Sequence, residues 1–195
     1  MQHQQVPTTD VFSFTHAHQP WINIKWGFEV IAAFICAHSG PECVFILQML
    51  ASLLLIWFFY RLLILFNIRS AGIFFLAVLL LLLSIEYRMI GRPEMISHLM
   101  VMIYLYLLML HEKSRSKLIW LIIPLQIIWT NMHEAYAIGI VMTALYTLTR
   151  FVQAKRNNTP LPVQAMALTL AAITSIVINP RGILLLTRPF NIFGQ

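Results

Sequence analysis

Six long apolar stretches occupy most of this 195-residue chain, and they restrict its possible folds more than any other feature. They are roughly residues 43–66, 71–87, 94–110, 118–130, 135–152 and 163–178. Blocks of this length with so few internal charges are typical of membrane-spanning helices. Only 10% of the residues are charged, whereas a soluble domain usually carries about 25%. We therefore predict an all-α protein that forms a polytopic transmembrane helical bundle.

The basic residues are sorted between alternate gaps. If the gaps after the first, third and fifth stretches face the cytoplasm, that side holds Arg61, Arg69, Lys113, Arg115, Lys117, Arg150, Lys155 and Arg156. The opposite side holds Lys25, Arg88, Arg92, Arg181 and Arg188. This imbalance predicts that the N-terminal segment is extracytoplasmic. The basic residues are spread over short loops and form no single patch, so we predict no nucleic-acid partner.

The acids and histidines fall mainly on the predicted outer side, with Glu112 and His111 as the exceptions. Acidic residues contribute little to orientation, so their segregation needs a second explanation. One interpretation is an outward-facing polar site above the bundle. The other is ordinary solvated loop and helix-end residues.

The chain divides into three predicted parts. Residues 1–42 are an extracytoplasmic loop with a short interfacial helix at about 26–38, which Gly40 and Pro41 end. Residues 43–178 are a six-helix transmembrane bundle, and residues 179–195 are an extracytoplasmic segment that starts a further interfacial helix. Residues 1–25 contain no apolar core that could carry them across a membrane, so we expect a fragment that lacks an upstream helix.

A proline and a pair of cysteines each lead to a structural prediction. Pro124 falls inside the fourth stretch, where we expect it to kink the helix. Cys36 and Cys43 flank the Gly-Pro turn on the predicted outer side, where an oxidising compartment would allow a disulfide. Because both cysteines lie at helix ends, with uncertain relative geometry, we predict two packed thiols instead.

The connection at residues 86–94 is the densest polar cluster in the chain. Arg88 and Arg92 could hold a phosphate through paired hydrogen bonds, or they could form ion pairs with neighbouring acids. Pro93 and Glu94 suit a helix start, because proline lacks the N–H that is unsatisfied there and the helix dipole favours an acid.

Residues 131–134 join two apolar stretches with almost no loop. Asn131 can cap such a tight turn. His133 and Glu134 then lie at the predicted membrane boundary, where polar groups are often functional. Either could act as a general acid or base, and the alternative is a turn that simply faces water.

The chain shows no recognisable metal or cofactor motif. His98 follows Glu94 by four residues on the same helix face, and such a pair could hold a metal if other ligands converged. The sequence identifies no such ligands. We therefore predict no metal site and no cofactor, and a divalent metal has no support.

Several short motifs together resemble a known family. Residues 8–15 (TTDVFSFT) and 19–26 (QPWINIKW) resemble the T-D-P-F-S-Y-T and P-W-V-N-H-E-W of the first outer loop of a prokaryotic membrane family. Residues 92–94 (RPE), 129–133 (WTNMH) and 179–182 (NPRG) resemble its R-P-Q, W-A-N-L-H and N-P-Y-G. That largely uncharacterised family is grouped with the GT-C glycosyltransferases, whose better-known members transfer sugars from polyprenyl-phosphate donors on the outer face of the membrane.

The resemblance implies a GT-C-like fold, a bacterial plasma (inner) membrane location and a lipid-linked sugar as partner, together with membrane lipid. With the polar clusters it gives a predicted site: catalytic Asp10, and substrate-binding Trp21, Arg88, Arg92, Glu94, Asn131, His133 and Glu134. The chain departs from the family pattern at Ile24-Lys25, where the family has H-E, and at Glu134-Ala135, where it has G-G.

Three functions remain open from the sequence. The first is a GT-C-like transferase that uses a polyprenyl-phosphate sugar. The second is a non-catalytic membrane protein that binds lipid-linked glycans or assists assembly. The third is a transporter or flippase, which should carry polar residues at mid-membrane on several helices. Gln48 and Gln126 are among the few polar residues in the middle of the stretches, which counts against transport.

Overall fold

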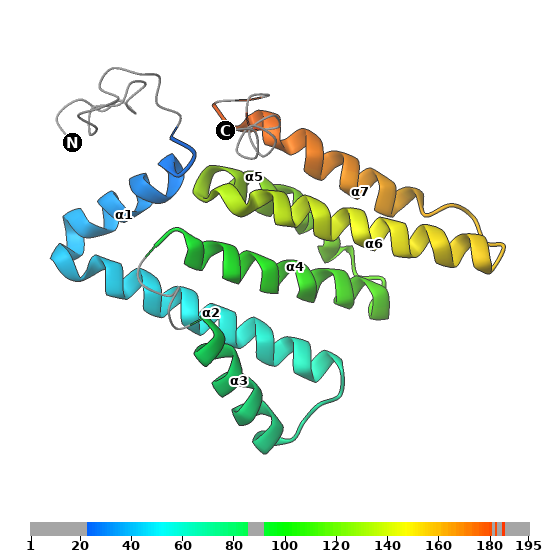
Figure 1. Ribbon diagram of the computed structural model, residues 1–195, viewed down its shortest axis with the longest axis horizontal. Helices are drawn as coiled ribbons and strands as arrows, with labels where there is room; N and C mark the ends of the chain where they lie inside the picture. The colour runs from blue at the N-terminus through cyan, green and yellow to red at the C-terminus, as the bar shows by residue number, and fades with distance from the viewer. Residues whose placement is uncertain (1–22, 86–91, 181, 183–184, 186–195) are drawn as a thin grey trace.

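The computed structural model describes residues 23–85, 92–180, 182 and 185, and within these ranges the chain is helical with no strand (Figure 1). The α-helices are α1 Trp26–Ser39, α2 Cys43–Leu65, α3 Ala71–Ile85, α4 Glu94–Ser114, α5 Ile122–Met132, α6 Ala137–Arg156 and α7 Val163–Thr174. Four 3-10 helices, at Gly40–Glu42, Lys117–Leu121, Glu134–Tyr136 and Ser175–Ile178, connect or extend them. The all-α prediction is confirmed.

Three segments in the described part of the chain are long and apolar enough to cross a membrane: Cys43–Leu65, Glu94–Ser114 and Glu134–Arg156. Four other apolar helical segments are shorter: Trp26–Ser39, Ala71–Leu83, Lys117–Met132 and Val163–Ile178. Each residue adds about 1.5 Å to the length of an α-helix, and the hydrocarbon core of a bilayer is about 30 Å thick. The short segments therefore need protein neighbours or local thinning of the bilayer to span it.

Helix α4 forms the centre of the bundle. It lies between α2 on one side and α5 and α6 on the other, and α7 packs against α5 and α6 (Figure 1). Tyr104 of α4 and Trp129 of α5 are fully buried, and their rings meet edge to face with centroids 5.4 Å apart. Gly139 of α6 lets that helix approach these two rings, because a Cβ there would lie 3.0 Å from each. This contact positions the N-terminal end of α6.

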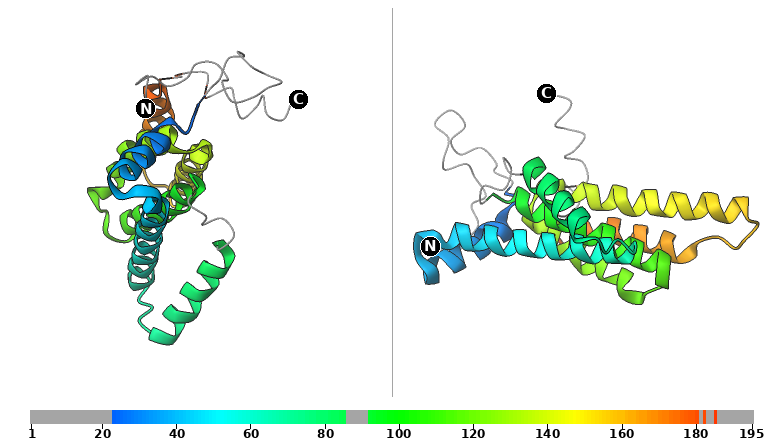
Figure 2. Two further views of the ribbon diagram at one scale, coloured as in Figure 1. Left: turned by 90° about the vertical axis from the view of Figure 1, so that its left-hand side faces the viewer. Right: turned by 90° about the horizontal axis from the view of Figure 1, so that it is seen from below.

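Helix α3 diverges from the bundle (Figure 2) and keeps an exposed apolar surface. Phe75 is 70% exposed and Leu83 is 60% exposed. Among the described helices, the main contact of α3 is with α2, and it is slight. In a bilayer such a surface faces acyl chains, which are as apolar as the side chains themselves.

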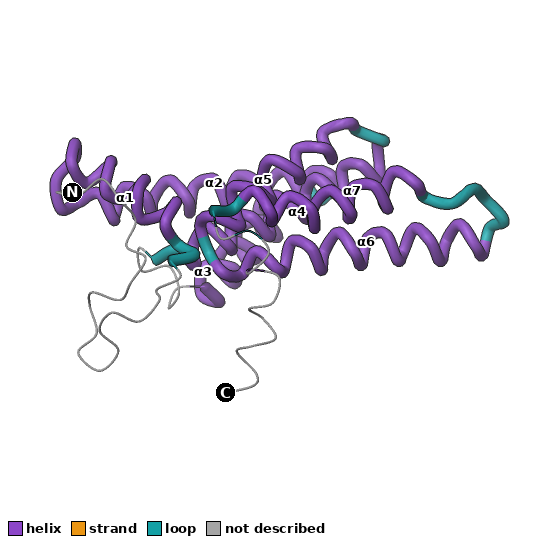
Figure 3. Tube along the Cα trace, turned by 90° about the horizontal axis from the view of Figure 1, so that it is seen from above, coloured by secondary structure: helices purple, strands orange, loops and turns teal. Residues whose placement is uncertain are grey.

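The helix connections lie at two opposite ends of the bundle (Figure 3). One end, called the polar end here, holds Lys25, Glu94, Asn131, His133 and Glu134, at the N-termini of α1, α4 and α6 and the C-terminus of α5. The other, called the basic end, holds Lys113, Arg115, Lys117, Lys155 and Arg156. The charge sorting seen in the sequence therefore becomes a separation in space.

Pro124 does not lie inside a continuous α-helix, because the helix changes type just before it. Residues Lys117–Leu121 form a 3-10 helix, and α5 begins at Ile122. Pro124 therefore occupies the first turn of α5, where a missing N–H is tolerated. The hydroxyl oxygen of Ser116 accepts a hydrogen bond from the backbone N–H of Leu118 and caps the 3-10 segment.

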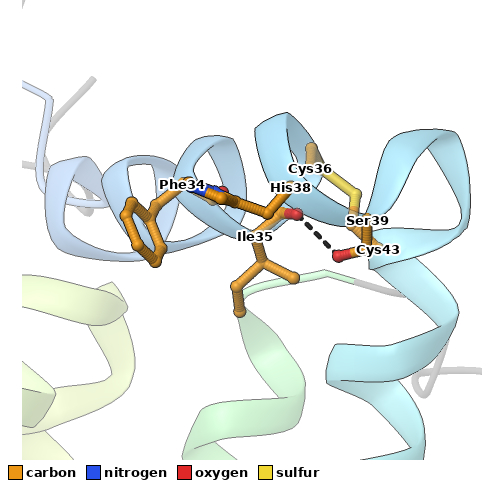
Figure 4. Close-up of a disulfide and its surroundings, with 6 residues drawn as sticks. All are labelled: Phe34, Ile35, Cys36, His38, Ser39 and Cys43. Atoms are coloured by element: carbon orange, nitrogen blue, oxygen red, sulfur yellow. Dashed lines mark hydrogen bonds between the residues drawn. A yellow bond between two sulfur atoms is a disulfide. The ribbon is translucent and has the colours of Figure 1, made fainter.

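The prediction of two packed thiols is wrong, because Cys36 and Cys43 form a disulfide (Figure 4). Gly40 has a φ of 75°, a left-handed conformation that favours glycine, and it ends α1 sharply. The 3-10 turn Gly40–Glu42 then starts α2 at once. This geometry brings the two Cα atoms to 4.8 Å, within the usual disulfide range.

Candidate functional site

A hydrogen-bonded chain of three buried side chains organises the polar end. The indole Nε1–H of Trp129 donates to the hydroxyl oxygen of Ser97 at 2.8 Å. Ser97 Oγ lies 2.7 Å from Nδ1 of His133. Ser97 and His133 are each 7% exposed, and Trp129 is fully buried. The three residues come from α4, from α5 and from the turn after α5, so the chain of bonds joins two helices at the site.

These bonds fix which nitrogen of His133 carries the proton. The backbone N–H of Ala135 donates to Nδ1 at 3.4 Å, and His133 thereby caps the short helix Glu134–Tyr136, so Nδ1 is an acceptor. Ser97, which accepts from the Trp129 indole, then gives its own hydrogen to the same nitrogen. Nδ1 is thus an acceptor, and in the neutral ring Nε2 bears the hydrogen.

The pKa of His133 is lowered from its ordinary value of 6.5, chiefly because burial penalises the charged imidazolium. The positive charge of Lys25 lowers the pKa further, while Glu134 and Glu94 act in the opposite direction. Protonation of Nδ1 would also remove the acceptor that serves Ser97 and Ala135. The neutral ring therefore persists below the pH at which an exposed histidine becomes charged.

This shift predicts a dependence of stability on pH. The folded state binds a proton at His133 less readily than the unfolded chain, so the contribution of His133 is complete above about pH 6.5 and is lost as the pH falls toward the lowered pKa. We expect the thermal midpoint in detergent to fall between pH 7 and pH 5. In His133→Asn, where the amide oxygen can replace Nδ1 as acceptor, this fall should be smaller. Equal falls in both proteins would contradict the assignment.

A cavity of about 270 Å³ adjoins His133. We call it the His133 cavity; its lining consists of Glu94, Ser97, His98, Val101, His133, Glu134, Ala135 and Ile138. Because Nδ1 is engaged, Nε2–H is the group that the His133 ring can offer to a ligand there. His98 Nδ1 is buried without a hydrogen-bond partner in the described structure, so it is a second polar group available to a bound molecule.

A second network ties α1 to the opposite side of the same turn. The indole Nε1–H of Trp26 donates to Oδ1 of Asn131 at 2.9 Å, and Nδ2 of Asn179 donates to the same oxygen at 3.0 Å. The amide of Asn131 in turn donates to the carbonyl of Ile127 at 2.7 Å. Gly27 is required here, because a Cβ would lie 2.7 Å from the backbone oxygen of Asn131.

A largely apolar groove of about 510 Å³ lies beside this second network. We call it the Trp26 groove; its lining consists of Trp26, Gly27, Val30, Ile31, Ile127, Ile128, Asn131, Met132, Ile178 and Pro180. The groove and the His133 cavity are therefore separated by the turn at residues 131–134. An apolar chain in the groove and a polar group in the cavity could be held on the two sides of one turn.

Lys25 and Glu134, two positions where the sequence departs from the motifs that it resembles, are neighbours in space. Lys25 Nζ lies 3.8 Å from Glu134 Oε1, in a partly exposed ion pair. Asn23 precedes this pair; its Oδ1 accepts from the backbone N–H of Lys25 at 2.9 Å, and its amide donates to Glu29 at 2.6 Å. An exposed ion pair contributes about 1 kcal/mol at most, so its main effect is to orient the two side chains.

The structure brings together Glu94, His133 and Glu134 in one cavity and places Asn131 on the other side of their turn. Arg92 is exposed just before α4 and does not line that cavity. Asp10, Trp21 and Arg88 lie outside the described residues.

Sequence reasoning did not select Ser97, Trp129 or Asn179 as site residues. Their role depends on contacts between distant helices, although Trp129 and Asn179 fall within the short motifs. His98 was considered only as a metal ligand. In the described ranges, no three His, Cys, Asp or Glu side chains gather into a metal-binding group. No protein-family model, no curated protein and no solved structure matches this chain.

Proposed function

We propose that this protein is an integral membrane transferase of the GT-C type, which transfers a sugar from a polyprenyl-phosphate donor at the polar end of the bundle. One observation carries the proposal. Trp26, Glu94, His133 and Asn179, from four separate motif segments, converge around a single turn. On one side of the turn is a cavity that acidic and histidine side chains help to line, and on the other is an apolar groove. A lipid-linked sugar has the same division into an apolar tail and a polar head.

The chemistry of the described residues supports the departure of the lipid phosphate. In sugar transfer an acceptor hydroxyl attacks the anomeric carbon, a carboxylate takes the hydroxyl proton, and the bond to the phosphate oxygen breaks with its electron pair. The Nε2–H of His133 would donate a hydrogen bond to the developing phosphate charge. The lowered pKa keeps the ring neutral over the physiological pH range, with Nδ1 bonded to Ser97 and the hydrogen on Nε2.

The proton acceptor in this proposal is a carboxylate near the His133 cavity. Asp10 remains the candidate given by the motif resemblance. Glu94 is the described alternative, because it lines the same cavity as His133. Arg88 and Arg92 remain candidates for contacts with the phosphate, since guanidinium groups bind its oxygens in pairs.

We place the polar end on the extracytoplasmic side of a bacterial plasma membrane. The basic end then faces the cytoplasm, in agreement with the positive-inside rule. The disulfide between Cys36 and Cys43 supports this orientation, because it lies away from the basic end. It joins the C-terminus of α1 to the N-terminus of α2, whereas the C-terminus of α2 lies at the basic end. Disulfides persist in oxidising compartments and are rare in the cytoplasm.

The proposal is tested with the full-length protein in proteoliposomes. A polyprenyl-phosphate donor with a radioactive sugar is supplied with a crude glycan and lipid extract as acceptor, and the release of polyprenyl phosphate is measured. We expect Glu94→Gln to lower this release by about tenfold or more, because the cavity loses a carboxylate. Glu42→Gln removes the same charge from an exposed position outside the cavity and should change the rate less than about twofold.

A non-catalytic binder of lipid-linked glycans is the second candidate. Ile24 favours it, because this residue is 5% exposed and belongs to the hydrophobic core at a position where the family motif has histidine. A proton carrier is therefore replaced by a packing residue. Donor that binds without being consumed would support this candidate, and a wild-type protein that neither binds nor consumes the donor would remove both.

A further inference from the structure

A second polar cavity lies at the basic end, far along α4 and α6 from His133. Its volume is about 400 Å³, and it is formed where the C-terminus of α4, the C-terminus of α6 and the segment before α7 meet. Two arginines line it, Arg115 and Arg150, together with Asn157 and Thr159. We call it the Arg115 cavity. The proposed transfer reaction uses none of these residues.

Arg150 is held in a fixed orientation within this cavity. Its Nη1 donates to Glu112 Oε1 at 2.8 Å and to Gln153 Oε1 at 3.1 Å. A guanidinium group has five N–H donors, so these two bonds leave further donors on Nη2 and Nε. Arg150 is therefore positioned by one acid without exhausting its capacity to bind another oxygen group.

Arg115 supplies the positive charge that Glu112 does not balance. Two arginines and one glutamate leave one net positive charge around the cavity. Arg115 has a φ of 53°, so it turns the chain sharply after α4, and its side chain is exposed. Helix α7 begins next to the cavity lining at Val163, so the positive end of its dipole adds to the same field.

An apolar surface continues from this cavity along α7, where exposed apolar side chains recur on one helix face. Val163 is 69% exposed, Met166 is 46% exposed and Leu170 is 64% exposed. Leu161, which lines the cavity, is 58% exposed. In a membrane these side chains face acyl chains, and the arginines lie at the level of the headgroups. A free anion would use only the polar half of this arrangement.

We propose that the Arg115 cavity binds the phosphate group of an anionic phospholipid, with the acyl chains packed against α7. The guanidinium of Arg115 and the remaining donors of Arg150 contact the phosphate oxygens, and Asn157 and Thr159 face the polar headgroup. On the orientation proposed above, this site lies in the cytoplasmic leaflet. The site does not depend on the transfer reaction at the polar end.

The test is lipid binding to the full-length protein in detergent, followed by native mass spectrometry. Phosphatidylglycerol and phosphatidylcholine with the same acyl chains are compared in wild type, Arg115→Gln and Arg156→Gln. The two substitutions remove one charge each from exposed positions at the basic end, but Arg156 does not line the cavity. We expect Arg115→Gln to weaken phosphatidylglycerol binding about tenfold and Arg156→Gln less than about twofold.

Other outcomes overturn the proposal. Equal losses in both variants would indicate general surface charge instead of a site. Equal binding of the two lipids by wild type would show that the anionic headgroup is not recognised. Displacement of phosphatidylglycerol by inorganic phosphate at an equal concentration would assign the cavity to a soluble anion, because the acyl chains would then add no affinity.

Discussion

His133→Asn is expected to lower the release of polyprenyl phosphate by about a hundredfold while the protein remains folded. The amide oxygen of asparagine can take the position of Nδ1, so it can still accept from Ser97 and from the backbone of Ala135. The substitution removes Nε2–H, which is the group offered to the cavity. The measurement is the rate in proteoliposomes, together with the thermal midpoint of the same preparation.

Two further variants separate this role from packing. His133→Gln replaces Nε2–H with an amide donor and loses the Nδ1 acceptor, so we expect it to be less stable than His133→Asn but more active. His111→Asn alters another buried histidine, whose Nδ1 bonds to the carbonyl of Ser116 at the basic end of α4. Its rate should remain within about twofold of wild type. A rate for His133→Asn equal to that of wild type would remove His133 from the proposed site.

Gly139→Val is expected to destabilise the protein by about 3 kcal/mol or more, through overpacking and the loss of a buried hydrogen bond. A Cβ at Gly139 would lie 2.5 Å from Oε1 of Gln126, a fully buried side chain that accepts from the Tyr104 hydroxyl and donates to the carbonyl of Tyr136. Trp129 would also have to move, which would disturb the hydrogen bond to Ser97. The thermal midpoint should fall by about 10 °C.

Gly72→Val is the matched control. Gly72 also lies in a helix, and the nearest atom to its added Cβ is the Ser70 hydroxyl oxygen, at 3.9 Å. Both substitutions introduce the same β-branched side chain, so the difference between them measures the close packing around Gly139 alone. We expect Gly72→Val to change stability by less than about 1 kcal/mol. Similar midpoints for the two variants would show that the contact at Gly139 is not tightly packed.

Hydrophobic patterning was sufficient to predict the helices but not their internal details. The apolar stretches give the helical segments because a buried or lipid-facing helix needs a long apolar run. The 3-10 segment before Ile122 and the disulfide between Cys36 and Cys43 depend on local backbone geometry. The disulfide depends on the φ of 75° at Gly40, and this backbone angle cannot be read from the amino-acid composition.

The candidate site was predicted in part for a similar reason. Glu94 and His133 lie at helix boundaries, where polar residues next to apolar runs are conspicuous in the sequence. Ser97 lies one turn inside α4, and a single serine in an apolar helix usually satisfies only a local bond. Its contacts with Trp129 and His133 cross 32 and 36 residues of sequence, so only the packing of α4 against α5 reveals them.

Helix α1 is fastened at both of its ends, and this limits how the protein can move. Trp26 is bonded to Asn131 at its start, and the covalent link from Cys36 to Cys43 holds its far end to α2. A helix attached at both ends stays fixed between α2 and α5 and does not rotate away from either of them. Entry of a bulky molecule into the Trp26 groove must then displace side chains along α1, or move α2 and α5 apart.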